Sequence, residues 1–426
     1  MGDARAIFAK NARQGLMSMA AALTLATTAL AGPQDTEAAM TETIGEAMLT
    51  EGTGTQEGLT QWLSTFKDRA LAAGFSSATL DALKGAEYLP KVVRNDRHQN
   101  EFTKTIWEYL DTAVSDDRIA HGLKALKSHG ETLARIEATY GVDAEVVAAI
   151  WGLESAYGAV RGDIPTLHAL ATLAYDGRRG AFFEAELIAA LKILQLGDAT
   201  PATLRGSWAG AMGHTQFMPS SWHAFAVDFT ADGKRDIWDD DPTDALASTA
   251  AYLAGKGWVK GAPWGAEITL PPGFNYDLTT ERVKKPVAEW QAMGVRLADG
   301  TDLPDHGPAS VLLPGGHRGA AFLIFQNFHV IETYNTADAY VIAVGHLADR
   351  LRGAGPILAP WPRDERALSF EERVALQKRL TAAGFDTGGV DAKMGPKTVA
   401  AIKTFQKARG MVPDGFPSLS VLQALQ

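Results

Sequence analysis

Apolar residues recur at helical spacing through most of residues 59–352, which indicates a predominantly helical protein. In the first such stretch, Leu59, Leu63 and Phe66 share one face, and Gly74 is expected to end the helix. The same spacing predicts helices over residues 77–83, 100–110, 131–140, 164–175, 181–196 and 244–255. Between residues 266 and 313 the apolar runs shorten and are broken by proline and glycine, and residues 320–325 are typical of a strand. The pattern therefore predicts a mainly α (α+β) fold with a small β-containing region.

One further expected helix begins after an N-cap at Asp143 and ends at Gly158. Val147, Trp151 and Glu154 follow one i, i+4, i+7 stripe, so the helix places Glu154 on a buried face. A poorly solvated carboxyl favours its neutral form, which would raise the pKa of Glu154 toward that of a general acid. The alternative is a helix-edge glutamate that is exposed or paired with an arginine, as most helical glutamates are. This segment alone leaves both interpretations open.

Composition narrows the function classes. The chain has 426 residues, enough for two or three domains, and its 46% hydrophobic and 21% charged residues are typical of a soluble globular protein. A formal net charge of -10 argues against broad nucleic-acid binding, which needs a Lys/Arg surface. The absence of cysteine excludes disulfides, thiolate metal sites, cysteine nucleophiles and a lipidated N-terminal cysteine.

The N-terminus has the organisation of a secretory signal peptide over residues 1–31. Arg5, Lys10 and Arg13 form a basic region, residues 16–30 an apolar core, and residues 29–31 an A-x-A cleavage site. An uncleaved membrane anchor is the alternative. Residues 32–58 are rich in Thr, Glu, Gly and Gln without apolar periodicity, which predicts a flexible lead.

A glycine-rich segment over residues 206–222 has the least ordinary composition in the chain. Its three glycines permit tight turns, while Ser207, Gln216, Phe217 and Trp222 offer the hydrogen-bonding and stacking groups that sugars need. The alternative is a glycine-rich turn that enters a helix near residue 220. That alternative explains the glycines and the cap but not the Gln-Phe-Met sequence over residues 216–218.

Residues 228–239 resemble the start of an EF-hand loop, in which oxygen-bearing side chains alternate ahead of Gly233. The twelfth position holds Asp239 instead of the usual glutamate, so a later acid would have to close the site. The expected calcium ligands are Asp228, Thr230, Asp232, the Lys234 carbonyl and Asp244. The alternative is an Asp-rich surface turn that caps the following helix.

The C-terminal part separates from the rest by composition. Residues 353–369 contain three prolines and are a linker candidate, and residues 370–426 carry three helical stretches over 371–383, 397–409 and 419–426. This predicts a small three-helix module near the lower size limit for independent folding.

Several of these motifs occur in the order found in one family. Glu154-Ser155 after an apolar helix, Arg178-Arg179, the segment 207–221, Asp228 to Gly233 with Ile237-Trp238, and Tyr334-Asn335 resemble the lytic murein transglycosylase B family, glycoside hydrolase family 103. His214 stands where the family's motif often has tyrosine. The tail from residue 370 resembles a peptidoglycan-binding module.

The resemblance implies a lysozyme-like catalytic domain over residues 59–352 that cleaves peptidoglycan glycan strands in the periplasm. Glu154 would be its sole catalytic acid and base, and Arg178 and Arg179 would face peptide or lactyl carboxylates. The residues implied to line the sugar subsites are Ser207, Gln216, Tyr252, Tyr334, Asn335 and Tyr340. No cofactor would be required for the chemistry, calcium would be structural, and other cell-wall enzymes would be further partners.

A single acid suffices for such chemistry only under one condition. Ordinary glycosidases place two carboxylates beside the scissile bond, whereas an N-acetyl carbonyl of N-acetylmuramic acid can supply an internal nucleophile. The sequence therefore predicts a lytic transglycosylase. The alternatives are a muramidase that hydrolyses the same bond and a non-catalytic wall-binding scaffold.

Overall fold

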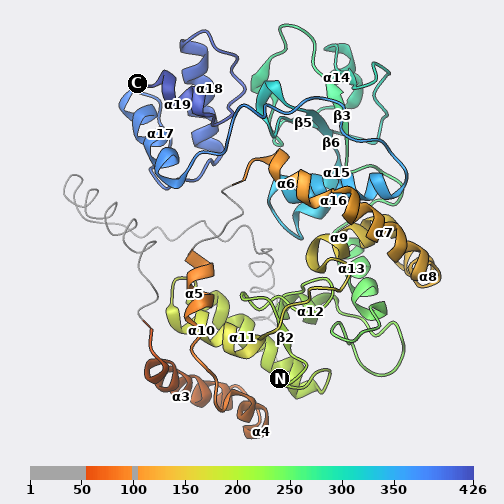
Figure 1. Ribbon diagram of the computed structural model, residues 1–426, viewed down its shortest axis with the longest axis vertical. Coiled ribbons are helices and arrows are strands. Elements are labelled where there is room, and N and C mark those ends of the chain that lie inside the picture. Colours follow the sequence, from red (N-terminus) through yellow and green to blue (C-terminus); the bar gives the residue numbers. More distant parts are fainter. Residues whose placement is uncertain (1–53, 98–103) are drawn as a thin grey trace, which may run out of the picture. The chain divides into compact units, whose positions relative to one another are not determined.

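The computed structural model describes residues 54–97 and 104–426. The predicted signal peptide and all but the last residues of the predicted lead lie outside the described residues. Within the described part, none of the helices combines the length and apolar character needed to cross a membrane. Helices predominate and the strands are short, which confirms the expected mainly helical fold with a small β-containing region (Figure 1).

The chain divides into two compact units, Met1–Gln99 with Asp117–Trp258, and Asn100–Asp116 with Val259–Gln426. The helices of the first unit are α3 (Gln56–Ala72), α4 (Ser77–Leu80), α5 (Pro90–Arg97), α7 (Asp116–Ser128), α8 (Gly130–Tyr140), α9 (Ala144–Ser155), α10 (Thr166–Asp176), α11 (Gly180–Leu196), α12 (Pro219–Phe225) and α13 (Thr243–Gly255). A two-stranded antiparallel ladder joins β1 (Ile164–Pro165) to β2 (Arg205–Gly206). The apolar stripes located most of these helices, but they did not predict α5 or α7.

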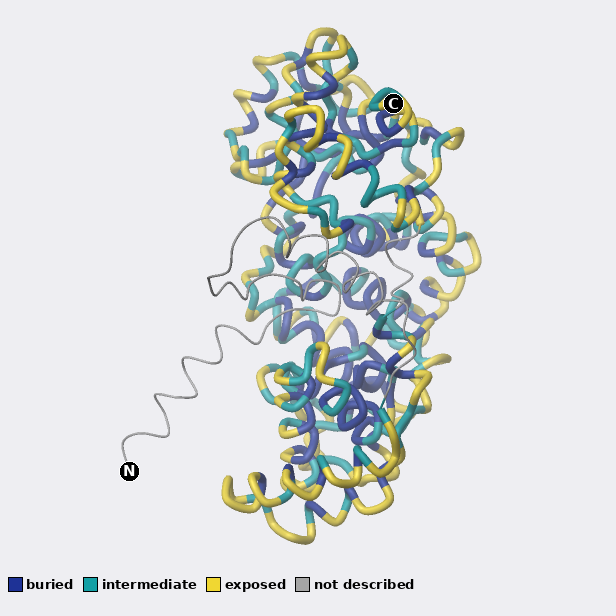
Figure 2. The backbone as a smooth tube through the Cα atoms, turned by 90° about the vertical axis from the view of Figure 1, so that its left-hand side faces the viewer, coloured by how far each residue is buried: buried dark blue, intermediate teal, exposed yellow. Residues whose placement is uncertain are grey.

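The core of the first unit is built by helices that bury nearly their whole circumference. Helix α9 buries an uninterrupted run from Val146 to Gly152, and α13 buries residues on every side of its first turns, from Thr243 to Ala250. The many alanines in these runs let neighbouring helices approach closely, so the helices pack without protruding side chains. Buried and exposed positions alternate along the outer helices (Figure 2), as expected for amphipathic stripes.

The second unit contains a four-stranded antiparallel sheet in the order β4-β3-β6-β5. Its strands are β3 (Gly265–Thr269), β4 (Arg296–Leu297), β5 (Ser310–Leu312) and β6 (Ala321–Ile324). The accompanying helices are α6 (Ile106–Ala113), α14 (Val287–Ala292), α15 (Gln326–Glu332) and α16 (Asp338–Leu351). The strand predicted over residues 320–325 is therefore confirmed, whereas the helix predicted over 100–110 is observed over Ile106–Ala113.

Helices α17 (Phe370–Ala382), α18 (Pro396–Ala408) and α19 (Leu419–Ala424) form a module with its own apolar core around Leu376, Ile402 and Phe405. A capping box at Ser369 starts α17, and Pro396 occupies the first turn of α18. Polar contacts join the module to the β-containing region. Lys403 Nζ donates to the Tyr276 carbonyl at 2.6 Å, and Lys407 pairs with Asp277 at 2.6 Å.

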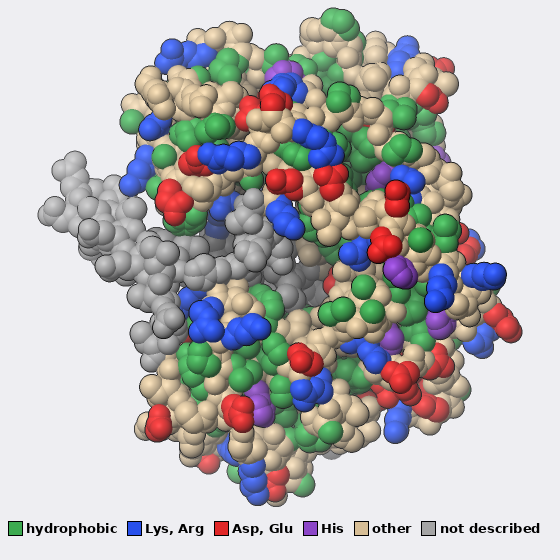
Figure 3. Space-filling view, in the orientation of Figure 1, with side chains coloured by type: hydrophobic (Ala, Val, Ile, Leu, Met, Phe, Trp, Pro, Cys, Tyr) green, Lys and Arg blue, Asp and Glu red, His purple; other side chains and the backbone are tan. Residues whose placement is uncertain are grey.

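Acidic and basic side chains are interspersed over the face of the molecule shown in Figure 3. A continuous basic stripe of the kind that tracks a nucleic-acid backbone is not visible on this face. This agrees with the net negative charge of the chain.

Candidate functional site

Glu154 is the penultimate residue of α9. Its stripe neighbours Val147 and Trp151 are buried, as predicted, but Glu154 itself is half-buried. The observed exposure of Glu154 therefore lies between the buried-face and the helix-edge interpretations. The position at the end of the helix explains the difference, because the chain turns away after Ser155 and leaves one side of Glu154 accessible.

The turn after Glu154 has an unusual backbone. The prediction that α9 continues to Gly158 is wrong, since the helix ends at Ser155 and Ala156 is the C-cap. Three successive residues then have positive φ: Ala156 at 49°, Tyr157 at 58° and Gly158 at 85°. A left-handed conformation costs a residue other than glycine about 1–3 kcal/mol, so surrounding contacts must impose it.

Two hydrogen bonds impose this turn. Ser155 Oγ accepts from the Gly158 amide at 2.9 Å, and the Tyr157 hydroxyl donates to the Arg118 carbonyl at 3.0 Å. Burial raises the pKa of Tyr157 to about 12, so its hydroxyl remains a donor. The segment that carries Glu154 is thus fixed on its C-terminal side.

At the other end of α9, Asp143 has the extended backbone of an N-cap but makes no side-chain cap hydrogen bond. Its carboxylate accepts from Trp258 Nε1 at 2.9 Å. The predicted N-cap position is therefore confirmed, although the side chain contacts a residue 115 positions away instead of the first turn of the helix.

The glycine-rich segment forms a tight loop around Gly206, Met212 and Phe217, which are joined by isolated bridges. Its glycines are required by space, because a Cβ at Gly206 would lie 2.0 Å from the Ala211 carbonyl oxygen. Ser207 Oγ accepts from the Ala211 amide at 3.1 Å, which leaves the hydroxyl proton for a ligand. Gln216 has φ of 53°.

The Gln216 side chain is oriented by its own amide nitrogen. Gln216 Nε2 donates to the Gly213 carbonyl at 2.9 Å and to the Arg161 carbonyl at 3.0 Å. With both amide protons used, the side-chain oxygen is the group that can accept from a sugar hydroxyl or amide. The loop thus has a hydroxyl donor at Ser207 and an amide oxygen acceptor at Gln216.

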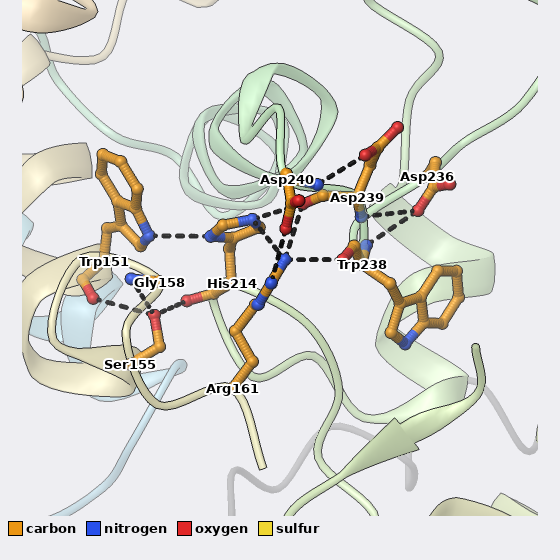
Figure 4. Close-up of polar contacts among 9 residues, drawn as sticks. All are labelled: Trp151, Ser155, Gly158, Arg161, His214, Asp236, Trp238, Asp239 and Asp240. Atoms are coloured by element: carbon orange, nitrogen blue, oxygen red, sulfur yellow. Dashed lines mark hydrogen bonds and ion pairs between the residues drawn. The ribbon is translucent and has the colours of Figure 1, made fainter. Parts of the chain in front are cut away.

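His214 connects this loop to α9, a role that the sequence did not signal. The Trp151 indole nitrogen donates to His214 Nδ1 at 3.1 Å, and Ser155 Oγ donates to the His214 carbonyl at 2.5 Å (Figure 4). His214 is 4% exposed and lies behind the helix that carries Glu154. Only its position between Gly213 and Gln216 could have marked it.

The acidic loop brings carboxylate oxygens of Asp228, Asp232 and Asp244 within 4.8 Å of one another. Asp228 accepts from the Gly233 amide at 2.9 Å, and buried Asp244 accepts from the Thr230 amide at 2.9 Å. Burial raises the pKa of Asp244, while hydrogen bonds from three backbone amides oppose this shift.

The remaining predicted ligands lie in the same loop. The Thr230 hydroxyl is 3.3 Å from Asp228 Oδ1, and the Lys234 amide donates to Asp232 at 2.9 Å. The donor set consists of oxygens only, which suits a hard cation such as Ca²⁺. The residues present therefore fit a calcium ion.

Arg178 and Arg179 have an internal carboxylate partner. Arg178 Nε lies 2.5 Å from Asp96 Oδ2, and Arg179 pairs with the other Asp96 oxygen. Asp96 is 2% exposed, so the carboxylate side of both ion pairs is buried. Arg178 retains 33% exposure of its side chain and Arg179 only 12%, so Arg178 is the more accessible to a ligand carboxylate.

The predicted tyrosines divide between the two units. Tyr252 is buried in α13 of the first unit, where its ring lies 6.0 Å from that of Phe217. Tyr334 and Tyr340 are buried in the second unit, around the turn between α15 and α16. Ala337 is the N-cap of α16, and the Asn335 side chain accepts from the Ala337 amide at 3.0 Å.

A helical domain with a glutamate at a helix end beside a glycine-rich loop defines a lysozyme-like enzyme of the transglycosylase class. Residues 58–349 match the transglycosylase SLT domain family, and residues 370–425 match a peptidoglycan binding domain family. The chain belongs to the transglycosylase SLT domain family.

Sequence and structure relatives agree with this assignment. Membrane-bound lytic murein transglycosylase B of Escherichia coli is 35% identical over 246 residues, and the match covers 56% of this chain and 65% of that protein. SltB3 of Pseudomonas aeruginosa is 47% identical with a TM-score of 0.84, covering 86% of this chain and 99% of that one. The Escherichia coli lytic transglycosylase Slt35, solved with calcium, is 30% identical with a TM-score of 0.60, covering 70% and 93%.

Proposed function

We propose that this transglycosylase cleaves the β-1,4 bond between N-acetylmuramic acid and N-acetylglucosamine in peptidoglycan and leaves 1,6-anhydromuramoyl ends, with Glu154 as its catalytic acid and base. The observation that carries the proposal is the placement of Glu154 at a fixed helix end that is joined through His214 to the loop of Ser207 and Gln216. SltB3 has been solved in complexes with NAG-anhNAM-pentapeptide and with NAG-NAM-pentapeptide, which supports this substrate class.

In the first step, neutral Glu154 donates its proton to the glycosidic oxygen. The carbonyl oxygen of the 2-acetamido group attacks C1 as the bond to the leaving sugar breaks, which gives an oxazolinium ion. In the second step, the Glu154 carboxylate removes the proton of the muramoyl 6-hydroxyl. That oxygen attacks C1 and opens the oxazolinium ring, so the anhydro product forms without consuming water.

Neighbouring acids are engaged elsewhere, which supports a one-acid mechanism. Asp176 pairs with Arg97 at 2.8 Å, and Glu184 pairs with Arg69 at 2.7 Å. Glu186 is buried and accepts from the Ser220 hydroxyl at 2.6 Å. Burial raises the pKa of Glu186.

The sugar and peptide contacts follow from the same site. Ser207 and Gln216 hold the acetamido group and the ring, which orients the reacting atoms. Arg178, with its exposed side chain, faces a lactyl or peptide carboxylate, and Arg179 supports it through the shared partner Asp96. The further subsite residues are Tyr252, Tyr334, Asn335 and Tyr340.

Replacement of the acid tests the mechanism. Glu154→Gln keeps the side-chain shape but cannot donate the proton, and loss of general acid catalysis lowers rates by roughly 10²–10⁴. We expect the variant to fold and bind peptidoglycan but to release almost no products from purified sacculi, as measured by mass spectrometry. Undiminished cleavage would mean that Glu154 is not the acid.

Product analysis in ¹⁸O-labelled water separates this activity from that of a muramidase. A transglycosylase yields anhydro ends without label, whereas reducing muramic ends that carry ¹⁸O would replace the proposal with hydrolysis. Binding to sacculi without any cleavage would favour a scaffold.

A structural calcium ion belongs to the proposal, held by Asp228, Thr230, Asp232, the Lys234 carbonyl and Asp244. An ion that binds only the folded state stabilises it by about 2.7 kcal/mol at a hundredfold excess over its dissociation constant. We expect a chelator to lower the melting temperature of the wild-type protein but not that of Asp232→Ala. If the chelator changes the melting temperature of neither protein, the loop is an Asp-rich surface turn and not a calcium site.

The domain organisation completes the proposal. Residues 1–31 direct export to the periplasm, residues 32–58 are a lead, residues 59–352 form the catalytic domain, residues 353–369 are the linker and residues 370–426 bind the wall.

Deleting residues 370–426 is expected to weaken sedimentation with insoluble peptidoglycan while cleavage of soluble fragments continues. Because Lys403 and Lys407 contact the β-containing region, the deletion also tests whether the module supports the catalytic fold. Loss of activity on soluble fragments would make the module part of the catalytic fold.

A further inference from the structure

His214 lies where three segments of the first unit meet. Its side chain contacts Trp151 of α9 on one side and the backbone of Asp239 on the other, with Nε2 2.6 Å from the Asp239 carbonyl (Figure 4). Its backbone is held as well, because its amide donates to the Ile237 carbonyl at 3.1 Å and its carbonyl accepts from Ser155. One residue therefore joins α9, the glycine-rich loop and residues 237–239.

The two partners of the imidazole fix its protonation state. An indole N–H only donates, so Nδ1 must carry the lone pair toward Trp151. With Nδ1 accepting, the proton of a neutral ring is on Nε2, which donates it to the Asp239 carbonyl at 2.6 Å. Arg161 Nη1 lies farther from Nε2, at 3.3 Å, and cannot donate to a protonated nitrogen. A second proton on Nδ1 would face the indole N–H, and the bond from α9 to the loop would be lost.

Burial favours the neutral form of His214, and the charged groups around it act in both directions. Arg161 Nη1 lies 3.3 Å from His214 Nε2 and donates to the Asp239 carbonyl at 2.8 Å, while Nη2 pairs with Asp240 at 2.8 Å. Burial lowers the pKa of His214, and Arg161 and His129 add to this shift. The Asp239 carbonyl and the Asp240 carboxylate oppose it, and the Asp241 carboxylate also faces the imidazole.

These contacts bracket the proposed acid. Trp151 and Ser155 lie on either side of Glu154 in α9, and both bond to His214. Two residues beyond His214, Gln216 is tied back to the Gly213 carbonyl at 2.9 Å. The distance between the carboxyl of Glu154 and the sugar-binding groups of the loop therefore depends on His214.

We infer that His214, as the neutral Nε2–H tautomer, is a positioning residue that fixes Glu154 relative to the glycine-rich loop. The inference rests on the proposed role of Glu154 in catalysis. Misplacing a reacting group by about 1 Å can lower the rate by roughly 10²-fold, whereas binding energy spread over many sugar contacts changes little. Loss of His214 should therefore affect kcat more than KM.

The test compares two histidines of the same unit. His214→Phe removes both side-chain hydrogen bonds and retains an aromatic ring. His223→Phe is the matched control, because His223 in α12 also has its pKa lowered by burial and bonds a backbone carbonyl, that of Ala189, at 2.9 Å. On soluble peptidoglycan fragments we expect kcat to fall at least about tenfold for His214→Phe with KM within about threefold. His223→Phe should keep kcat within about twofold even where its melting temperature falls equally. Equal kcat losses in both variants, or none in either, would overturn the inference.

A double-mutant cycle tests the link to α9 directly. Trp151→Phe should lower kcat in the wild-type background and have little further effect when His214 is already Phe, because both changes break the same hydrogen bond. Additive effects on kcat would mean that the two residues act independently, which would contradict the inference.

A measurement on the unmutated protein does not depend on activity. Selective ¹⁵N-histidine labelling should show His214 with an unprotonated Nδ1 and a protonated Nε2 at pH 7. A protonated Nδ1 would overturn the inference whether or not the enzyme cleaves its substrate. Full activity of Glu154→Gln would instead overturn the proposed function and leave the tautomer result standing.

Discussion

Asp96 in the first unit is buried and Asp338 in the second is half-buried, and the surroundings of the two carboxyls are opposite. Asp96 accepts hydrogen bonds from Arg178 and Arg179, which lie more than 80 positions away in the chain. Asp338 has the carboxyls of Glu281 and Glu332 as neighbours, and burial together with these acids raises its pKa to about 7. The comparison shows that burial alone does not decide what a carboxylate contributes, since two guanidinium groups contact Asp96 whereas two further acids surround Asp338 and help to raise its pKa.

The difference predicts opposite responses to mutation, and the largest effect is expected at Asp96. Asp96→Ala leaves two guanidinium groups beside an empty acceptor site, and breaking a buried ion pair typically costs about 3–5 kcal/mol. Because Arg178 is 33% exposed, we expect roughly 3 kcal/mol, measured by urea unfolding.

Asp81→Ala is the control for this change. Asp81 pairs with Lys84 at 2.9 Å, but both side chains are more than half exposed. Its loss should change the free energy of unfolding by less than about 0.5 kcal/mol. Equal effects of the two substitutions would remove the distinction between a buried and a surface pair.

Asp338→Asn should have the opposite sign. The folded state holds a proton on Asp338 at pH values where the unfolded chain has lost it, so the wild type loses stability as pH rises from about 4 to about 7. Asparagine removes this loss. We therefore expect the variant to gain about 1 kcal/mol or more at pH 8 and little at pH 4, measured by thermal unfolding across pH. If Asp338→Asn were less stable than the wild type at pH 8, the raised pKa of Asp338 would be contradicted.

The smallest effect is expected from Glu281→Gln, which keeps the side-chain size and removes one of the two neighbouring charges. The pKa of Asp338 in the folded state should then fall, so the loss of stability should still begin near pH 4 but end at lower pH and be smaller. The shift is expected to be a fraction of a pH unit, because burial is the larger cause. An unchanged pKa of Asp338 would mean that Glu281 contributes nothing and would leave burial and Glu332 as the causes.

The sequence predicted the parts of the fold that depend on local spacing. Helices α8, α11 and α13 were expected over nearly their observed ranges, because an amphipathic or alanine-rich stripe is a property of neighbouring residues. The glycines of the loop were likewise expected to allow close backbone approach, as Gly206 does.

Contacts between distant segments could not be predicted in the same way. The N-cap position of Asp143 was predicted, but the contact of its carboxylate with Trp258 was not. The shared partner of Arg178 and Arg179 lies on α5, a helix that the pattern missed. The end of α9 was misplaced because Ala156 and Tyr157 are not residues that favour positive φ. One of the two hydrogen bonds that impose this turn joins Tyr157 to Arg118, 39 positions away, and no local pattern signals that contact.

The Tyr157 ring also limits which residues can replace Gly152 in α9. A Cβ at Gly152 would lie 2.5 Å from the Tyr157 ring carbon that bears the hydroxyl, and that ring is held by Trp151 and by the Arg118 carbonyl. The order of substitution therefore matters: Gly152→Ala should be harmful in the present background and tolerated once Tyr157 has become a small residue. In a mutational library the two positions would show strong epistasis, and a lineage could change Gly152 only after Tyr157.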